Sequence, residues 1–174
     1  ICFVPDGDYA SFIEQYTGQS SEPGDFVNKE GKVLGKDKGQ IHYTIGQRRG
    51  LGISAPESLY VCGKSLDSNE VILGGKQDLM SNYCYINDIN LIPWDHLDAP
   101  IKCKVKTRYR QPEQPATVEQ IGEDLIKITF DEPQRAVTPG QAAVLYDDDM
   151  VLGGGTILPE GLASTMTTSQ GTNN

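Results

Sequence analysis

The stretch IKCKVKTRYR, residues 101–110, decides the fold because cationic and other residues alternate along its whole length. Successive side chains of a β-strand point to opposite faces. The alternation therefore predicts a strand over residues 101–109, with one cationic face and one mostly apolar face. The cationic positions are Lys102, Lys104, Lys106, Arg108 and Arg110.

Two interpretations of this cationic face are open. An acidic neighbouring strand could pair with it in a ladder of salt bridges. Alternatively, the face could bind phosphates, since Lys and Arg neutralise phosphate groups and Arg can clamp one with two hydrogen bonds. Tyr109, between the two arginines, could stack on a base or support the sheet.

Short β-rich runs separated by turn signals follow one another from Tyr83 onward. Regular short strands of this kind favour a small closed barrel, because closure removes unpaired edges. The glycines at 153–155 indicate a bend or bulge in a strand rather than a phosphate loop. We expect strands near 83–91, 101–109, 116–121, 125–130, 142–147 and 150–157.

The preceding region is more mixed. Residues 8–16 predict a short helix that ends at Thr17-Gly18, two short strands follow, and residues 59–75 predict a hairpin. The fold class is therefore mainly β, with a small mixed α/β module followed by a β-barrel. We expect these to occupy residues 8–77 and 78–158, with the end of another domain over 1–7 and a disordered tail over 159–174.

The formal charge of −9 hides an asymmetry, because the segment 101–110 carries five positive charges and no acid, which leaves −14 on the other residues. Local potential decides where a polyanion docks. A second basic spot includes Arg48 and Arg49, which lie in the glycine-rich stretch 46–52 and could be surface arginines of a solvated loop.

The cysteines at 2, 62, 84 and 103 match no zinc spacing, so we expect no metal site. Cys62 and Cys103 alternate with strand-like neighbours, which indicates that these two cysteines are small buried apolar residues. A reducing cytoplasm is the default compartment, and no apolar run is long enough to span a bilayer.

Four motifs resemble a known family in order and spacing. ICF at 1–3, HYTIGQRRGLGI at 42–53, TRYRQP at 107–112 and FDEPQRAVTPGQAAVLYD at 130–147 are similar to the tRNA-specific 2-thiouridylases. The resemblance implies a PP-loop domain that precedes these residues, a small central domain and a C-terminal barrel.

The resemblance also implies a reaction and its residues. ATP, together with Mg²⁺, would activate the C2 oxygen of the wobble uridine in the PP-loop domain, and a cysteine persulfide would deliver sulfur to C2. Cys2 matches the persulfide cysteine, and a disulfide bond belongs to the family's features. Since the PP-loop is not in this sequence, we expect no ATP site here and no product from this chain alone.

For tRNA binding, the resemblance points to Arg108, Tyr109 and Gln141, and the alternation extends this set to Lys106 and Arg110, with Arg48 and Arg49 as further contacts. The expected partners are tRNA and a sulfur-carrier protein or cysteine desulfurase relay, for a cytoplasmic monomer.

One alternative is a non-enzymatic barrel that docks a sulfur-carrier protein through its acidic surface. Another alternative is a methyltransferase, but the sequence contains no glycine-rich cofactor loop after a predicted strand.

Overall fold

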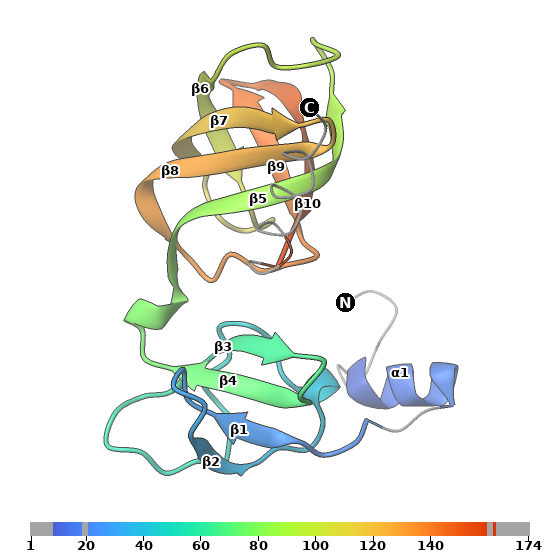
Figure 1. Cartoon of the computed structure of the whole chain (residues 1–174), viewed down its shortest axis with the longest axis vertical. Helices are drawn as coiled ribbons and strands as arrows, with labels where there is room; N and C mark the ends of the chain where they lie inside the picture. The colour runs from blue at the N-terminus through green and yellow to red at the C-terminus, as the bar shows by residue number, and fades with distance from the viewer. Residues whose placement is uncertain (1–8, 19–20, 160–161, 163–174) are drawn as a thin grey trace, which may run out of the picture. The chain divides into compact units, whose positions relative to one another are not determined.

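The computed structural model describes residues 9–18, 21–159 and 162. The chain divides into two compact units between Leu79 and Met80 (Figure 1). The predictions for residues 1–7, and those for nearly all of the tail 159–174, lie outside the described residues.

The first unit is built on a four-stranded mixed sheet of order β2-β1-β4-β3, in which β1 and β4 are parallel. The helix before it ends where Gly18, at a φ of 68°, donates its amide to the carbonyl of Glu14. The elements are α1 (Tyr9–Thr17), β1 (Asp25–Val27), β2 (Val33–Lys36), η1 (Gln40–His42), β3 (Tyr60–Ser65), β4 (Glu70–Gly74) and η2 (Gln77–Leu79).

Apolar burial and one polar anchor hold this unit together. The rings of Phe26 and Tyr43 meet edge to face at 5.0 Å and pack with buried aliphatic side chains of β3 and β4. Each fully buried side chain of this kind contributes about 1.5–3 kcal/mol. Asp37 is also buried, and its Oδ1 accepts the backbone amides of Gly24 (3.0 Å) and Gly39 (2.5 Å). The carboxylate thereby ties the end of β2 to the chain that enters β1.

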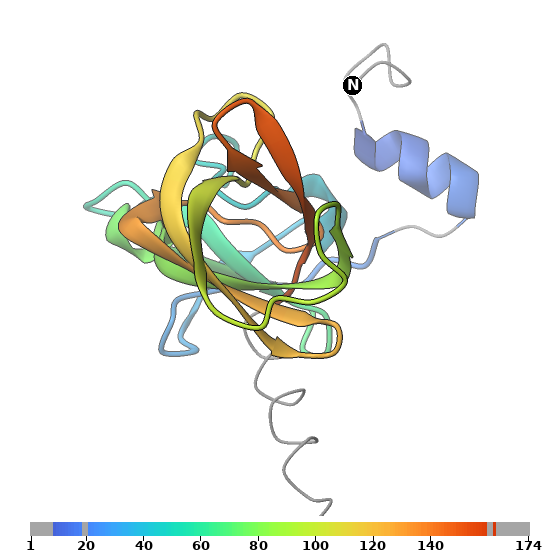
Figure 2. The ribbon, with the colours of Figure 1, turned by 90° about the horizontal axis from the view of Figure 1, so that it is seen from above.

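The second unit is a closed barrel of six strands in the order β10-β5-β8-β7-β6-β9. Figure 2 shows these strands curving around a common core. On β8, Ile126, Ile128 and Phe130 are buried in the barrel while the residues between them face outward. The strands are β5 (Met80–Leu91), β6 (Ile101–Lys106), β7 (Gln114–Gly122), β8 (Leu125–Arg135), β9 (Ala142–Asp147) and β10 (Met150–Ile157).

The three consecutive glycines let β10 lie close to both of its neighbours. The ladder register shifts on each side of them, between Val151 and Gly153 and between Gly154 and Thr156. A Cβ at Gly153 would meet the carbonyl oxygen of Asn90 on β5, and one at Gly154 would meet that of Ala143 on β9. The prediction of a bulged strand at this position is confirmed.

The predicted fold class, mainly β with a mixed module and a barrel, is also confirmed. The predicted strand over residues 101–109 is wrong at its C-terminal end, because β6 stops at Lys106. Val105 pairs with Gln114, so the chain must reverse between these two residues to begin β7. Arg108, Tyr109 and Arg110 therefore lie in a turn and not on a strand.

Candidate functional site

Several chain segments meet at the end of the barrel where β5 begins. Lys106 at the end of β6 pairs with Val144 on β9, and Arg135 at the end of β8 pairs with Met80 on β5. Because these pairings are antiparallel, the turn after β6 and the loop from β8 to β9 lie at the same rim. We call residues 106–111 and 134–141 together the basic rim.

A hydrogen-bonded chain through Thr138 joins the two segments. Arg108 Nη2 donates to Thr138 Oγ1 at 2.8 Å, and that hydroxyl donates to the carbonyl of Ala136 at 2.9 Å. The carbonyl of Thr138 accepts the amide of Gln141 at 3.2 Å. Thr138 thus connects two of the predicted site residues, Arg108 and Gln141, which are distant in sequence.

A second link fixes the turn itself. Gln111 Nε2 donates to Gln134 Oε1 at 3.3 Å, and the amide of Gln111 bonds to the carbonyl of Arg108 at 3.1 Å. Gln134 is buried, with 6% of its surface exposed. The turn that carries Arg108 and Tyr109 is therefore bonded to Gln134 near the end of β8 and to Thr138 in the loop that follows.

The charge of the basic rim is uniformly positive. It contains Lys106, Arg108, Arg110 and Arg135 and no acidic residue. Burial first, and then the neighbouring charge of Arg135, lower the pKa of the Arg108 guanidinium. A bound anion would relieve both effects, because it compensates for lost hydration and for like-charge repulsion.

The cations of the segment 101–110 fall into two groups. Lys102 pairs with Asp131 at 2.7 Å and Lys104 with Asp148 at 2.9 Å. Among the described residues, Lys106, Arg108 and Arg110 form no ion pair. The salt-bridge interpretation thus holds for the first two positions, and phosphate binding stays a prediction for the other three.

Two of the side chains expected at the RNA, Tyr109 and Gln141, are open to solvent. The exposed fraction of Tyr109 is 93%, and Gln141 is exposed next to Gly140, which has a φ of 80°. The amide of Gly140 and the carbonyl of Ile157 bond at 2.8 Å, and the amide of Ile157 bonds back to Gln141 at 2.8 Å. The end of β10 therefore fixes the backbone that presents the Gln141 side chain.

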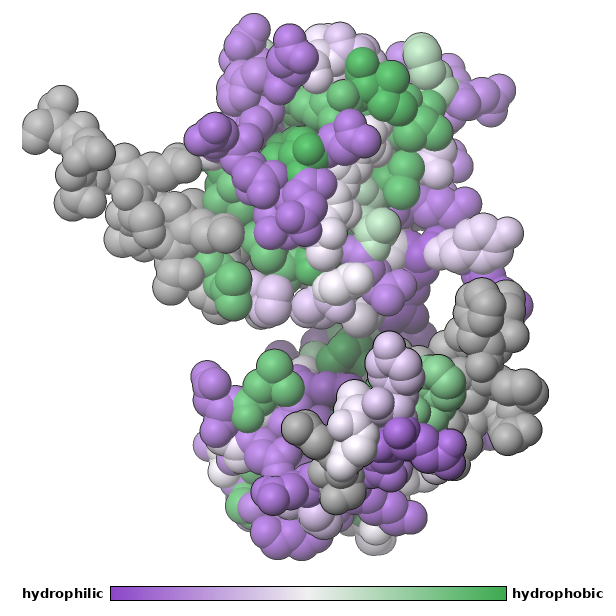
Figure 3. Space-filling view, turned by 90° about the vertical axis from the view of Figure 1, so that its right-hand side faces the viewer, coloured by the Kyte–Doolittle hydropathy of each residue, from purple (hydrophilic) through white to green (hydrophobic). Residues whose placement is uncertain are grey.

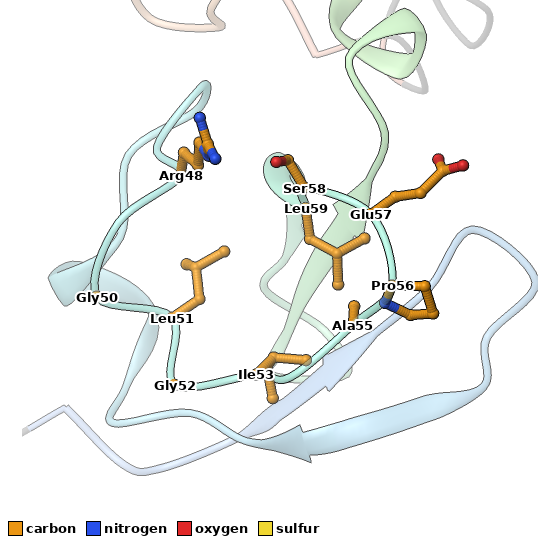
Figure 4. Close-up of a pocket in the computed structure, with 10 residues that line it drawn as sticks. All are labelled: Arg48, Gly50, Leu51, Gly52, Ile53, Ala55, Pro56, Glu57, Ser58 and Leu59. Carbon is orange, nitrogen blue, oxygen red and sulfur yellow. The ribbon is translucent and has the colours of Figure 1, made fainter.

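Arg48 and Arg49 belong to the first unit. Both are exposed on a loop that β3 anchors, since the amide of Val61 bonds to the carbonyl of Gln47 and the amide of Gly46 to that of Val61. Arg48 lies at the edge of an open hollow of about 390 Å³. Figure 4 shows Leu51, Ile53 and Leu59 along the two arms of the loop that enclose this hollow.

The described cysteines are poor nucleophiles. Cys62, Cys84 and Cys103 are free thiols, and burial raises the pKa of Cys84 to about 12 and that of Cys103 to about 11. The sequence predicted small buried apolar residues at Cys62 and Cys103; both are half-buried, and Cys103 packs against the barrel core. The described residues contain no disulfide, and the predicted site residue Cys2 lies outside them.

Two features are absent from residues 9–18, 21–159 and 162. Within them no group of three or more His, Cys, Asp or Glu side chains could hold a metal ion. No helix in the same ranges is long and apolar enough to cross a membrane.

Comparison with known proteins gives a family for each unit and for the chain. The tRNA methyl transferase PRC-barrel domain matches residues 10–75, and the aminomethyltransferase beta-barrel domain matches residues 81–157. The chain is 45% identical to the tRNA-specific 2-thiouridylase MnmA of Clostridioides difficile and 44% identical to that of Carboxydothermus hydrogenoformans, in both cases over 157 residues, or 90% of the chain. The chain belongs to the tRNA-specific 2-thiouridylase family.

The chain spans less than half the length of these curated relatives, 44% for the C. difficile enzyme and 43% for that of C. hydrogenoformans.

Sequence reasoning missed the residues that assemble the rim. Thr138, Gln111 and Gln134 make the side-chain hydrogen bonds between its two segments, and Arg135 adds a fourth cation. Residues 134, 135 and 138 fall inside the 130–147 motif, and Gln111 inside TRYRQP. The motifs indicated the region, but the sequence does not show which of their polar residues are hydrogen-bonded to one another. These partners are brought together only by the closure of the barrel.

Proposed function

We propose that the barrel unit binds tRNA through the basic rim, as the RNA-holding part of an ATP-dependent tRNA 2-thiouridylase. The observation that carries this proposal is the rim itself, where four cationic residues and an almost fully exposed Tyr109 occur in two segments without a carboxylate. Phosphate neutralisation supplies most of the affinity of proteins for nucleic acids, and exposed aromatic rings stack on unpaired bases.

The rim residues differ in what they offer an RNA. Lys106, Arg108 and Arg110 can neutralise backbone phosphates, while the side-chain amide of Gln141 can both donate to and accept from a base or ribose. Arg48 and Arg49 are exposed on the first unit and would add further phosphate contacts to the same tRNA.

The chemical step belongs to the full-length enzyme. ATP with Mg²⁺ would adenylate the C2 oxygen of the wobble uridine in the preceding domain with release of pyrophosphate, and AMP would leave with that oxygen when the terminal sulfur of the Cys2 persulfide attacks C2. A cysteine thiol of the preceding domain would then attack the Cys2 sulfur, which releases the thiolated base and leaves a disulfide between the two cysteines. Half-buried or buried thiols with raised pKa values are poor substitutes for Cys2, because the thiolate is the reactive form. A sulfur-carrier protein or a cysteine desulfurase would load Cys2, and the protein would act as a cytoplasmic monomer.

Direct binding tests this proposal. The chain should bind unmodified tRNA with an affinity that falls steeply as salt rises, and charge reversal at Lys106, Arg108 and Arg110 should abolish that binding. If the reversed variant binds tRNA as tightly as the unsubstituted chain, the assignment of the rim is wrong.

A second candidate, docking of a sulfur-carrier protein, rests on the opposite end of the barrel. That end carries the acidic turn at 147–149, and Ile92, Met150 and Val151 expose apolar surface near it. Figure 3 shows apolar side chains gathered near the top of the barrel unit. Capture of a sulfur-carrier protein that survives RNase treatment would favour this function, whereas RNase-sensitive capture would favour tRNA binding.

The methyltransferase hypothesis has less support. The first unit matches a tRNA methyl transferase PRC-barrel domain, but the relatives that span both units are tRNA-specific 2-thiouridylases. Transfer of a methyl group from S-adenosylmethionine to tRNA by the full-length enzyme would reverse this conclusion.

A further inference from the structure

The hollow beside Arg48 in the first unit has walls of mixed chemistry. Leu51 and Ile53 form part of one wall and Leu59 part of the other, and Figure 4 shows the Leu51 and Leu59 side chains pointing into the space between the two arms of the loop. Polar backbone and side-chain groups, including Ser58, surround these aliphatic groups. A ligand with a flat face and a polar edge would match both kinds of surface.

The fold itself holds this hollow in place. Leu51 is 8% exposed and belongs to the core of the first unit, against which Ile53 also packs. Ile53 lies directly over Gly35 of β2, where an added Cβ would come within 2.6 Å of its Cδ1 atom. On the preceding arm, Gln47 Nε2 donates to the carbonyl of Arg49 at 3.0 Å. Both the aliphatic floor and the backbone that carries the arginines are therefore fixed.

Arg48 adds a positive charge at the edge of the hollow. Its side chain is exposed, and it forms no ion pair with any residue that the structure describes. Glu57 also lines the hollow, but Figure 4 shows its side chain pointing away from the space between the arms. The loop 46–59 contains two arginines and one glutamate, a formal charge of +1. The charge of the loop thus favours an anion next to the hollow.

We propose that this hollow binds one unpaired nucleotide of the tRNA, with its base between Leu51 and Leu59 and its phosphate on Arg48. The inference rests on the proposed tRNA binding and adds a base site to a unit for which we expected phosphate contacts alone. A splayed nucleotide combines a flat base, a polar edge and an attached phosphate, which these walls and Arg48 can bind. The volume of about 390 Å³ suits a ligand of this size, since small-molecule sites occupy roughly 300–1,000 Å³.

Methyl NMR of the 174-residue chain tests where the base lies. The chain is titrated with unmodified tRNA and, separately, with a fully paired RNA duplex of similar length. We expect tRNA to shift the methyl signals of Leu51, Ile53 and Leu59, and the duplex to leave them unchanged, because its bases are stacked and paired. Unchanged signals when tRNA binds, or equal shifts with the duplex, would overturn the base site while leaving tRNA binding intact.

Two substitutions on the same loop test the hollow by filling it. Ala55→Trp places a large side chain at an exposed position that lines the hollow, whereas Ser54→Trp places the same side chain at the exposed neighbour that does not line it. We expect Ala55→Trp to weaken tRNA binding about 10-fold and Ser54→Trp less than about twofold. Thermal unfolding checks that both variants fold. An affinity of Ala55→Trp equal to or above that of Ser54→Trp would overturn the base site.

The two neighbouring arginines separate the phosphate of this nucleotide from other phosphates. Arg48 lines the hollow and Arg49 does not, and neutralising either one changes the net charge equally. One nucleotide would contact both Arg48 and the hollow, so Arg48→Gln/Ala55→Trp should lose clearly less affinity than the product of the two single losses. Arg49→Gln/Ala55→Trp should lose the full product. The same additivity for both pairs would overturn the base site, whereas absence of tRNA binding by the unsubstituted chain would overturn the proposed function as well.

Discussion

Arg108 and Thr138 are hydrogen-bonded at 2.8 Å although they lie 30 positions apart in the chain. The contact exists because β6 and β8 end at the same rim of a closed barrel. It fixes one N–H group of the half-buried Arg108 side chain, and a guanidinium carries five such donors. Preorganisation of this kind reduces the entropy lost when a long side chain is fixed on binding.

The Thr138 hydroxyl should therefore affect RNA affinity without touching RNA. Thr138→Val keeps the side-chain shape but removes the acceptor for Arg108 and the donor to Ala136. We expect the free energy of unfolding to fall by about 1 kcal/mol and tRNA affinity to fall about threefold to tenfold. Thr138→Ser retains the hydroxyl and should behave like the unsubstituted chain in thermal unfolding and in tRNA titration. Equal losses for both variants would show that the hydroxyl is not responsible.

The two groups of cations in residues 101–110 should respond differently to neutralisation. Arg108→Gln/Arg110→Gln removes two rim charges that form no ion pair among the described residues, whereas Lys102→Gln/Lys104→Gln removes two that are paired with Asp131 and Asp148. Both pairs of substitutions change the net charge equally. We expect tRNA affinity to fall about 100-fold for the arginine pair and less than about threefold for the lysine pair. Equal effects in a titration at fixed salt would mean that net charge alone controls binding.

Two glycines of the barrel unit should differ in their tolerance of a methyl group. A Cβ at Gly154 would collide with the carbonyl of Ala143, while one at Gly140 meets nothing within 4 Å and faces only an unfavourable φ of 80°. Gly154→Ala should lower the free energy of unfolding by about 3 kcal/mol or more, because the backbone of β9 or β10 must move. Gly140→Ala should cost about 1–2 kcal/mol. Urea unfolding of the two variants checks this order, and a reversed order would contradict the close approach of β9 to β10.

The buried Cys84 should make the barrel less stable in alkali. Burial raises the pKa of its thiol from an ordinary value of 9.0 to about 12. Between these values the unfolded chain releases a proton that the folded chain retains, so unfolding is favoured and stability falls as the pH rises from 9 towards 12. From pH 9 to 10.5 this amounts to about 1–2 kcal/mol.

A Cys84→Ala variant isolates this contribution. It should be less stable than the unsubstituted chain at pH 8, because it leaves a small cavity, but its stability should decline less steeply above pH 9. Urea unfolding midpoints at pH 8, 9, 10 and 10.5 give the two slopes. Parallel slopes would show that Cys84 is not the group whose titration weakens the folded state.

Much of the fold could be predicted from local patterns. The short β-rich runs from Tyr83 onward and the turn signals between them predicted most strand positions, because side-chain direction and turn conformation depend on near neighbours in sequence. The end of β6 could not be predicted in this way. The alternation of cations continues to Arg110, but the pairing of Val105 with Gln114 requires the chain to turn earlier.

For the candidate site, too, sequence and tertiary structure determine different features. By itself the sequence determined which residue types are present: a run of cations, a tyrosine between two arginines, and motifs that mark the family. Only the tertiary structure decided which cations are neutralised by Asp131 and Asp148, and that Arg108, Gln141 and Arg135 share one rim around Thr138. The physical reason is that charge pairing and hydrogen bonding depend on distances of a few ångströms between residues far apart in the chain, which barrel closure fixes and local sequence does not.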